Sequence, residues 1–310
     1  MCRDTRWGLL LAESKLISVH SSYSHVIELC ELNHSSLCHV NWYDVVVSIS
    51  GNRRSPRVLA IVPAHDEGPR VGAVVRMLVA QGLPVLVVDD GSADNTAAEA
   101  RAAGARVLSL RPNRGKGAAL KAGFRVALGR GLSDDPAVLD AGSTLSPSPT
   151  WASASDWDAI LTLDGDGQHD PAEAPAFIER WSATGADLVV GARDYREMPP
   201  VRWFTNSVSR VLFSSALGQR VPDNQSGYRL RSLRVAEASM ESPEQGFAFE
   251  VEEIALCAGR GYTIAWVPIR TIYGTEVSDI KPWSHLVSFV RVTSRARRVM
   301  QAERRRSWRG

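Results

Sequence analysis

The chain has 310 residues, of which 44% are hydrophobic and 23% are charged. This composition is typical of a soluble globular protein, and it excludes collagen-like, coiled-coil and wholly disordered classes. The formal net charge is only +2, so bulk charge gives no indication of a nucleic-acid partner. The four cysteines are scattered, and the sequence has no convincing secretion signal, which predicts a protein of a reducing compartment. No eighteen apolar residues run together, so we do not expect the chain to span a membrane.

The two ends of the chain differ from its middle. Residues 1–55 lack sustained apolar periodicity, so we expect a poorly ordered N-terminal extension. Residues 291–310 contain eight Arg and one Glu, a net charge of +7, which leaves the other 290 residues at −5. The basic character of the protein therefore belongs to its C-terminal segment, 284–310, which we expect to be an amphipathic helix.

Apolar strand patterns and helical patterns alternate from Pro56 onward. The expected strands are 58–62, 85–88, 106–110, 159–163 and 188–190, and the expected helices are 71–79, 96–103, 116–128 and 171–181. This alternation predicts an α/β fold with a largely parallel, Rossmann-like sheet flanked by helices on both faces.

Two regions depart from this alternation. Residues 131–156 contain Ser-Pro-Ser-Pro and no apolar period, which predicts a flexible surface insertion. Beyond residue 191 we expect helices at 201–217 and 249–257 and a strand at 262–267. This later helical and β part would build the second wall of a cleft.

Acidic residues follow three of the expected strands. They are Asp66 and Glu67, then Asp89 and Asp90, then Asp164 and Asp166. In an open parallel sheet, ligands bind beyond the carboxyl ends of the strands. Asp164 and Asp166 repel each other unless a cation lies between them, and the glycines at 165 and 167 would let a ligand approach the backbone.

Hard oxygen donors without a His or Cys pair favour Mg²⁺ or Mn²⁺, which usually binds one or two carboxylates together with substrate phosphates. A nucleoside diphosphate is therefore the expected partner. The segment 63–67 has no G-x-G-x-x-G pattern, and 113–117 lacks the Ser or Thr that follows the Lys of a phosphate loop. The first absence gives NAD binding little support, and the second excludes ATP hydrolysis of the phosphate-loop type.

Four motifs, in this order, resemble those of family 2 glycosyltransferases. They are Val-Pro-Ala-His-Asp-Glu at 62–67, Val-Asp-Asp-Gly-Ser-Ala-Asp-Asn-Thr at 88–96, Asn-Arg-Gly-Lys-Gly-Ala-Ala-Leu at 113–120 and Leu-Asp-Gly-Asp-Gly-Gln-His at 163–169. Gln168-His169 and the segment Gln-Ser-Gly-Tyr-Arg-Leu at 225–230 are similar to the branch of dolichyl-phosphate mannose synthase and the bacterial polyprenyl-phosphate glycosyltransferases. The resemblance extends over residues 56–295, and we place the catalytic domain at 56–283.

This resemblance implies a GT-A fold, a nucleotide-sugar donor such as GDP-mannose or a UDP-hexose, a Mg²⁺ or Mn²⁺ ion, and inversion at the anomeric carbon. The donor-binding residues that it implies are Pro63, Ala64, Glu67 on the ribose, Asp89 on the base, Gly91, Lys116, Asp164, Gly165 and Arg193. The implied metal ligands are Asp164, Asp166 and Gln168. One departure is His65-Asp66, where relatives have Tyr-Asn, and it affects the expected base contact.

Sugar transfer places negative charge on the leaving diphosphate, so a metal and cationic side chains at that end stabilise the transition state. Asp166 would act through the metal. The cationic candidates are Lys116, Arg193 and Arg229, each at an expected loop or strand end. A solvated surface charge is the alternative role for each of them.

The acceptor determines whether a general base is needed. A phosphate monoester, with a second pKa near ~6, is already largely a dianion at neutral pH. Arg202 and Arg210, on the expected helix 201–217, are candidates for holding the phosphate of a dolichyl- or undecaprenyl-type lipid beside an apolar groove. Core packing is the alternative role for the apolar face of that helix.

Three other functions remain open. A family 2 enzyme that acts on a hydroxyl would need a base, for which Asp223 is the candidate. A nucleotidyltransferase would also use an acidic pair and a metal, but it would release pyrophosphate. A catalytically inactive binding module is the third possibility.

The C-terminal segment suggests where the protein works. Leu286, Phe289, Val290, Thr293 and Met300 fall near one helical face, and arginines populate the others. This pattern predicts peripheral attachment to the anionic cytoplasmic surface of a membrane. A solvated basic tail is the alternative interpretation.

Overall fold

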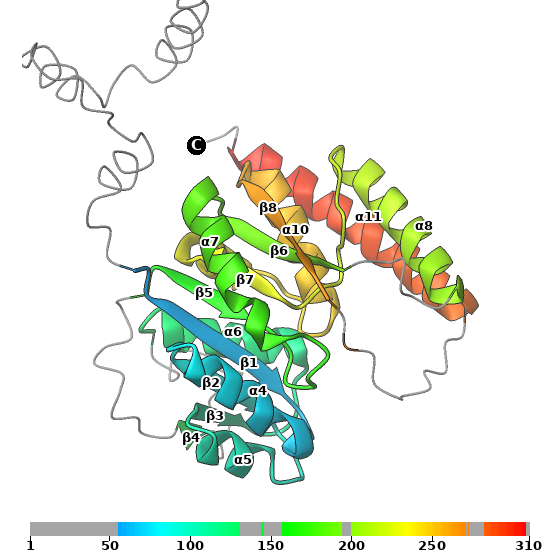
Figure 1. Cartoon of the computed structure of the whole chain (residues 1–310). Coiled ribbons are helices and arrows are strands. Elements are labelled where there is room, and N and C mark those ends of the chain that lie inside the picture. The colour runs from blue at the N-terminus through cyan, green and yellow to red at the C-terminus, as the bar shows by residue number, and fades with distance from the viewer. Residues whose placement is uncertain are drawn as a thin grey trace, which may run out of the picture. The chain divides into compact units, whose positions relative to one another are not determined.

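The computed structural model describes residues 55–130, 144–145, 157–193, 200–270, 272 and 282–307 (Figure 1). The chain divides into two units, Met1–Arg54 and Ser55–Gly310, and all the described residues belong to the second unit. The expected N-terminal extension, and most of the expected insertion at 131–156, lie outside the described residues.

The described strands form one eight-stranded sheet in the order β4-β3-β2-β1-β5-β7-β6-β8. They are β1 (Val58–Ala64), β2 (Val85–Asp90), β3 (Arg106–Leu110), β4 (Thr144–Leu145), β5 (Ala159–Thr162), β6 (Leu188–Arg193), β7 (Arg229–Ser232) and β8 (Ile264–Ile269). β1 is parallel to β2 and β5, β2 to β3, and β6 to β8. β7 runs antiparallel between β5 and β6, and β4 is antiparallel to β3. The expected largely parallel sheet is confirmed, with two antiparallel strands added to it.

Helices cover both faces of this sheet (Figure 1). They are α4 (Gly68–Ala80), α5 (Thr96–Ala102), α6 (Lys116–Ala127), the 3₁₀ helix η2 (Pro171–Glu173), α7 (Ala174–Thr184), α8 (Pro200–Leu217), α9 (Leu233–Ser239), α10 (Ala248–Arg260) and α11 (Pro282–Ser307). α4, α5 and α7 contribute to the core on one face, whereas α6, α9 and α10 contribute to the core on the other. Among the described helices, none is long and apolar enough to cross a bilayer.

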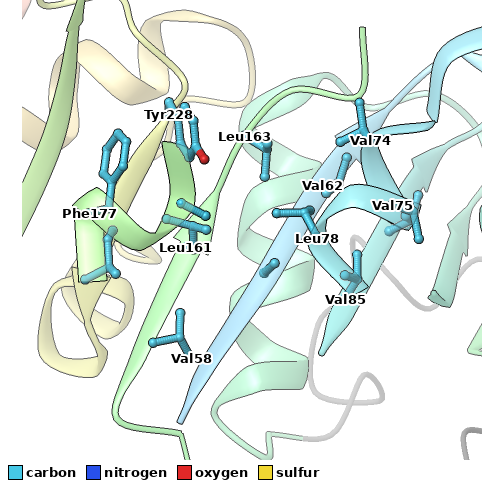
Figure 2. Close-up of a cluster of buried hydrophobic side chains, with 14 of the residues drawn as sticks. Val58, Val62, Val74, Val75, Leu78, Val85, Leu161, Leu163, Phe177 and Tyr228 are labelled. Atoms are coloured by element: carbon cyan, nitrogen blue, oxygen red, sulfur yellow. The ribbon is translucent and has the colours of Figure 1, made fainter. Parts of the chain in front are cut away.

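Successive side chains of β1 enter the two cores in turn. Val58, Ala60 and Val62 join the core on the α4 side, whereas Leu59 and Ile61 join the other. Because both faces of the strand are buried, every position of β1 is apolar. Figure 2 shows the first of these cores, in which side chains of α4 and α7 pack against those of β1 and β5.

α11 belongs to this compact unit. Its Ala296 and Met300 are buried in a third core with residues of β6, α8 and α10, and Figure 1 shows α11 beside α8 and α10. The expectation that Met300 lies on a face available to a membrane is therefore wrong, because α10 covers it. The side chains of residues 282–292 lie outside the description, so the Leu286 end of that face stays a prediction.

Two strand predictions need correction. β2 continues through Asp90, so Asp89 and Asp90 are strand residues whose carboxylates accept backbone N–H groups from the following loops. β7 was not expected at all, because the arginines at 229 and 231 are not typical of a buried strand. Part of the expected insertion also pairs with the sheet, as β4.

Candidate active site

The carboxyl ends of β1, β2 and β5 form one edge of the sheet, because these three strands are parallel neighbours. Ala64 at the end of β1 is in register with Asp89 of β2. The Gly165 N–H donates to the Pro63 carbonyl over 3.3 Å, and a Cβ on Gly165 would lie 3.1 Å from the Cβ of Ala64. The absence of a side chain at Gly165 thus lets the loop after β5 pack against the end of β1.

The loops after β1 and β2 are fastened to each other. Asp66 accepts a hydrogen bond from the Ala93 N–H over 2.8 Å, and its own N–H donates to the Ser92 hydroxyl. The N–H of Glu67 donates to the Thr96 hydroxyl over 2.8 Å. Asp66 adopts a φ of +54°, a conformation that Asp and Asn tolerate better than most residues. Asp66 therefore connects the loop after β1 to the loop after β2.

The residues expected around the nucleoside lie on these loops. The carboxylate of Glu67 pairs with Arg70 over 2.8 Å and is 18% exposed, so it remains accessible to a ribose. Asp89 is buried and accepts the Ser92 N–H, and Gly91 follows β2 directly. Pro63 and Ala64 end β1 at the same edge, and the binding of a nucleoside by these residues stays a prediction.

Three charged side chains meet beside β5. The Lys116 ammonium lies 2.7 Å from Asp164 Oδ1 and 3.1 Å from Glu250 Oε2. Lys116 is the first residue of α6, and Glu250 belongs to α10. A Cβ on Gly227 would lie 2.8 Å from both Asp164 Oδ2 and Lys116 Nζ, and 2.9 Å from Glu250 Oε1. The bare Cα of Gly227 therefore leaves the space in which these groups meet.

This grouping shifts their pKa values. Burial lowers the pKa of Lys116, but attraction by Asp164 and Glu250 outweighs burial and raises it above its usual value. Burial raises the pKa of Asp164, but Lys116 and His169 outweigh burial and lower it. The pKa of Glu250 is raised by burial. Lys116 is thus a cation and Asp164 an anion at neutral pH.

Asp166 and Gln168 complete the expected metal-binding loop. Asp166 Oδ1 accepts the Gln168 N–H over 2.9 Å. Burial and the neighbouring Asp164 raise the pKa of Asp166, so a cation would favour its charged form. These hard oxygen donors fit Mg²⁺ or Mn²⁺. Within the described ranges no three His, Cys, Asp or Glu residues gather to enclose a metal, so substrate or water oxygens would complete the coordination shell.

His169 supports this loop from within the protein. Its ring is buried, with Nε2 3.8 Å from Asp164 Oδ2 and the ring centroid 5.5 Å from that of Tyr228. Burial lowers the pKa of His169, although Asp164 opposes this shift. His169 therefore packs between Asp164 and the aromatic ring of Tyr228.

Arg193 and Asp223 form a bidentate pair. Arg193 Nε and Nη2 donate to the two carboxylate oxygens of Asp223 over 2.7 and 3.0 Å, and the N–H groups of Gln225 and Arg193 donate as well. Asp223 has no exposed side-chain surface. Burial raises the pKa of Asp223, but Arg193 outweighs burial and lowers it. A buried carboxylate with a lowered pKa, which accepts hydrogen bonds from four donors, is poorly suited to act as a general base.

Comparison with known proteins agrees with this geometry. The sequence model of the family described as "Glycosyl transferase family 2" matches residues 59–141 and 150–239, which include every strand-end motif. The chain belongs to glycosyl transferase family 2. It is accordingly a glycosyltransferase, and the expected GT-A fold is confirmed.

The chain is also similar to curated relatives and to solved structures. An undecaprenyl-phosphate mannosyltransferase from Micrococcus luteus is 31% identical over 243 residues, covering 73% of this chain and 87% of the relative. A polyprenol monophosphomannose synthase from Mycolicibacterium smegmatis is 26% identical over 234 residues, covering 70% and 78%. The glucosyl-3-phosphoglycerate synthase from Mycobacterium tuberculosis, solved with Mn²⁺, UDP-glucose and phosphoglyceric acid, is 18% identical with a TM-score of 0.57, covering 82% of each chain. The last comparison concerns the fold alone.

Arg229 does not take the place expected of it in a family 2 site. It is wholly buried, and its guanidinium donates to Glu253 Oε2 over 3.1 Å, the Glu250 carbonyl over 2.6 Å and the Ser226 carbonyl over 2.8 Å. A guanidinium enclosed in this way has no surface to offer a diphosphate. We therefore correct its expected catalytic role to a structural one.

The two arginines expected to bind the acceptor lie on α8, which packs against α11. Eight residues of helix span about 12 Å, so Arg202 and Arg210 leave α8 roughly two turns apart. Arg210 is half-buried, and the side chain of Arg202 lies outside the description. Their acceptor role stays a prediction.

The sequence interpretation missed Glu250 and Gly227 as site residues. Glu250 lies in Phe-Glu-Val-Glu-Glu-Ile, a segment in which three acidic residues interrupt an apolar helix. Charged residues at such positions are almost never buried unless they are paired. That pattern was the available signal that Glu250 has a cationic partner elsewhere in the chain.

Proposed function

We propose that this family 2 enzyme transfers a sugar, with inversion, from a nucleoside-diphosphate sugar to a polyprenyl phosphate, in a reaction that depends on Mg²⁺ or Mn²⁺. The observation that carries the proposal is the similarity, over most of both chains, to relatives named for undecaprenyl phosphate and polyprenol monophosphomannose. The acidic edge of the sheet supports the donor half of the reaction.

The residues of that edge have distinct roles in the proposed reaction. The loop of Glu67 and the end of β2 with Asp89 would bind the nucleoside. Asp164, Asp166 and Gln168 would hold the metal, which when bound stabilises charge on the leaving diphosphate. Lys116 orients Asp164 through the 2.7 Å contact. Because Lys116 also contacts Glu250, its charge is shared between two carboxylates and only partly available to the donor.

The state of Asp223 favours an acceptor that needs no general base. Asp223 is fully engaged by Arg193 and by backbone. A hydroxyl acceptor would require it to take up a proton, whereas a phosphate is already ionised at neutral pH. This favours a lipid phosphate over the hydroxyl alternative.

Product analysis with matched donors tests the reaction class. Purified protein is incubated with undecaprenyl phosphate, MnCl₂ and either GDP-mannose or UDP-glucose, and the released nucleotide is identified. Release of a nucleoside diphosphate with a new sugar lipid is the expected result, and the preferred donor identifies the base. Release of a sugar 1-phosphate, with the nucleoside monophosphate carried over to the acceptor, would instead indicate nucleotidyl transfer and contradict the proposal.

We further propose that the enzyme works at the anionic cytoplasmic surface of a membrane, to which α11 attaches it peripherally. Ala296 and Met300 of α11 face the core, whereas Arg297, Arg298 and Arg305 are exposed. The contribution of this described part of α11 would therefore be electrostatic, with each basic residue near the lipid adding about 1 kcal/mol.

A further inference from the structure

Charged residues of alternating sign lie in a row from the core beneath α10 to the acidic edge of the sheet. Their side chains form ion pairs, except that Arg229 contacts Glu250 through the main-chain carbonyl. In order, the row contains Arg231, Glu253, Arg229, Glu250, Lys116 and Asp164. We call these six residues the charge ladder. Glu253 accepts from Arg231 over 2.8 Å and from Arg229 over 3.1 Å. Arg229 then donates to the carbonyl of Glu250, whose carboxylate contacts Lys116.

Exposure increases along the charge ladder toward the donor site. The side chains of Arg229, Arg231 and Glu253 are 0% exposed, Glu250 is 4% exposed, Lys116 12% and Asp164 25%. Asp164 is therefore the member that a ligand can reach. Of the other members, Lys116 contacts Asp164 directly, and Glu250 contacts Lys116.

Within the charge ladder, Glu250 is the residue that connects Lys116 to the buried arginines. Its Oε2 contacts Lys116, and its Oε1 is buried without a hydrogen-bond partner among the described residues. Gly227 keeps the space between Glu250, Lys116 and Asp164 free of side chain, since a Cβ at this position would come within 3 Å of all three groups. The ionic contact of Glu250 is thus directed at Lys116.

We infer that Glu250 is a positioning residue for the donor site: it holds the Lys116 ammonium between two carboxylates, so that Lys116 orients Asp164 without neutralising it. The carboxylate of Glu250 faces the Lys116 ammonium at 3.1 Å, which favours its ionised form against the effect of burial. When Glu250 is ionised, the group of three carries one net negative charge. Without that charge, Lys116 pairs with Asp164 alone, and Asp164 attracts a cation or a ribose donor less strongly. The inference rests on the proposed function only for the identity of the ligand, a nucleoside diphosphate with its metal.

Glu252 offers a matched control on the same helix. The side chain of Glu252 is as buried as that of Glu250, with 3% exposed against 4%. Its carboxylate pairs with Arg295 of α11 and accepts from the Ser242 hydroxyl over 2.6 Å. Replacing Glu252 therefore removes a buried paired carboxylate from α10 without changing the partners of Lys116.

Calorimetric titration separates a positioning role from a merely structural one. GDP and UDP are titrated in MnCl₂ into the wild-type protein, and the tighter ligand is then titrated into Glu250→Gln and Glu252→Gln, whose thermal unfolding is also recorded. We expect Glu250→Gln to weaken binding about tenfold, which corresponds to about 1.4 kcal/mol. Glu252→Gln should leave the affinity within about twofold, because Lys116 keeps both partners. Unchanged affinity in Glu250→Gln, or an equal loss in both variants, would overturn the inference.

A second comparison tests whether Glu250 acts through Lys116. In a Lys116→Met background, Glu250→Gln should change nucleotide affinity by less than about twofold, because the charge that it balances is gone. A loss as large as in the wild-type background would show that Glu250 acts by another route. These titrations involve no acceptor, so failure of transfer to polyprenyl phosphate would contradict the proposed function and leave the result for Glu250 standing.

Discussion

At the level of single residues, Gly227 shapes the donor site by having no side chain. We predict that Gly227→Ala lowers kcat/KM at least about tenfold, because its Cβ would displace Asp164, Lys116 and Glu250 from contacts of about 3 Å. All three neighbours are side-chain ends, so unfolding temperature should change little. Steady-state kinetics and thermal unfolding measure the two effects. A variant with wild-type kinetics would show that the meeting of these groups is unimportant.

Asp166 is the second single-residue test. Because the metal's stabilisation of the leaving diphosphate is worth several kcal/mol, we predict that Asp166→Ala lowers kcat roughly a hundredfold or more. EDTA should abolish wild-type activity, and MnCl₂ should restore it. The control is Asp170→Asn in the same loop, whose side chain accepts the Ala172 N–H at the start of η2. Full activity in EDTA would contradict the metal's role.

At the level of elements, β7 and α10 depend on each other through buried charge. Glu253 of α10 is the carboxylate partner of both Arg229 and Arg231 of β7. Glu253→Ala would leave two buried guanidinium groups without this charge, and we predict a loss of about 3–5 kcal/mol in the free energy of unfolding. Glu241→Ala, which removes a mostly exposed partner of Arg260, should cost at most about 1 kcal/mol. Urea denaturation measures the free energy of unfolding of both variants. Equal losses in the two would contradict this prediction.

α11 provides the element-level test of membrane attachment. We predict that the double variant Arg297→Glu, Arg298→Glu pellets much less with anionic vesicles than wild type, because the exposed charge is reversed. The wild-type protein should be released by high salt. Arg101→Glu with Arg180→Glu, both exposed on other helices, gives the same change in net charge and should pellet normally. Charge reversal is preferable to truncation after Val290 as a test, because truncation would also remove the packing of Met300 and Glu303 against α10. Equal sedimentation of both double variants would exclude α11 as the anchor.

At the level of the whole molecule, the alternation of apolar runs was enough to predict the parallel half of the sheet. Strand 106–110 has the expected bounds, because its apolar residues face covered surfaces. β7 could not be predicted, because its two arginines pair with a glutamate more than twenty positions away in the sequence. The acidic edge of the sheet could be predicted from the order of strands in the sequence. The contact between Glu250 and Lys116 could not, because it depends on the packing of α10 against α6. Sequence patterns thus predict what local periodicity controls, and they miss charge pairs made by distant segments.

Transfer of the sugar to a lipid phosphate can be tested with two acceptors that differ only in that phosphate. Undecaprenyl phosphate and undecaprenol are each incubated with the preferred nucleotide sugar and MnCl₂, and the radiolabelled sugar in the lipid fraction is counted. We predict sugar transfer to undecaprenyl phosphate and none above background to undecaprenol. Asp223 is paired with Arg193 and is therefore not available to activate a hydroxyl. Equal transfer to both lipids, or transfer to undecaprenol that is lost in Asp223→Asn, would contradict that prediction.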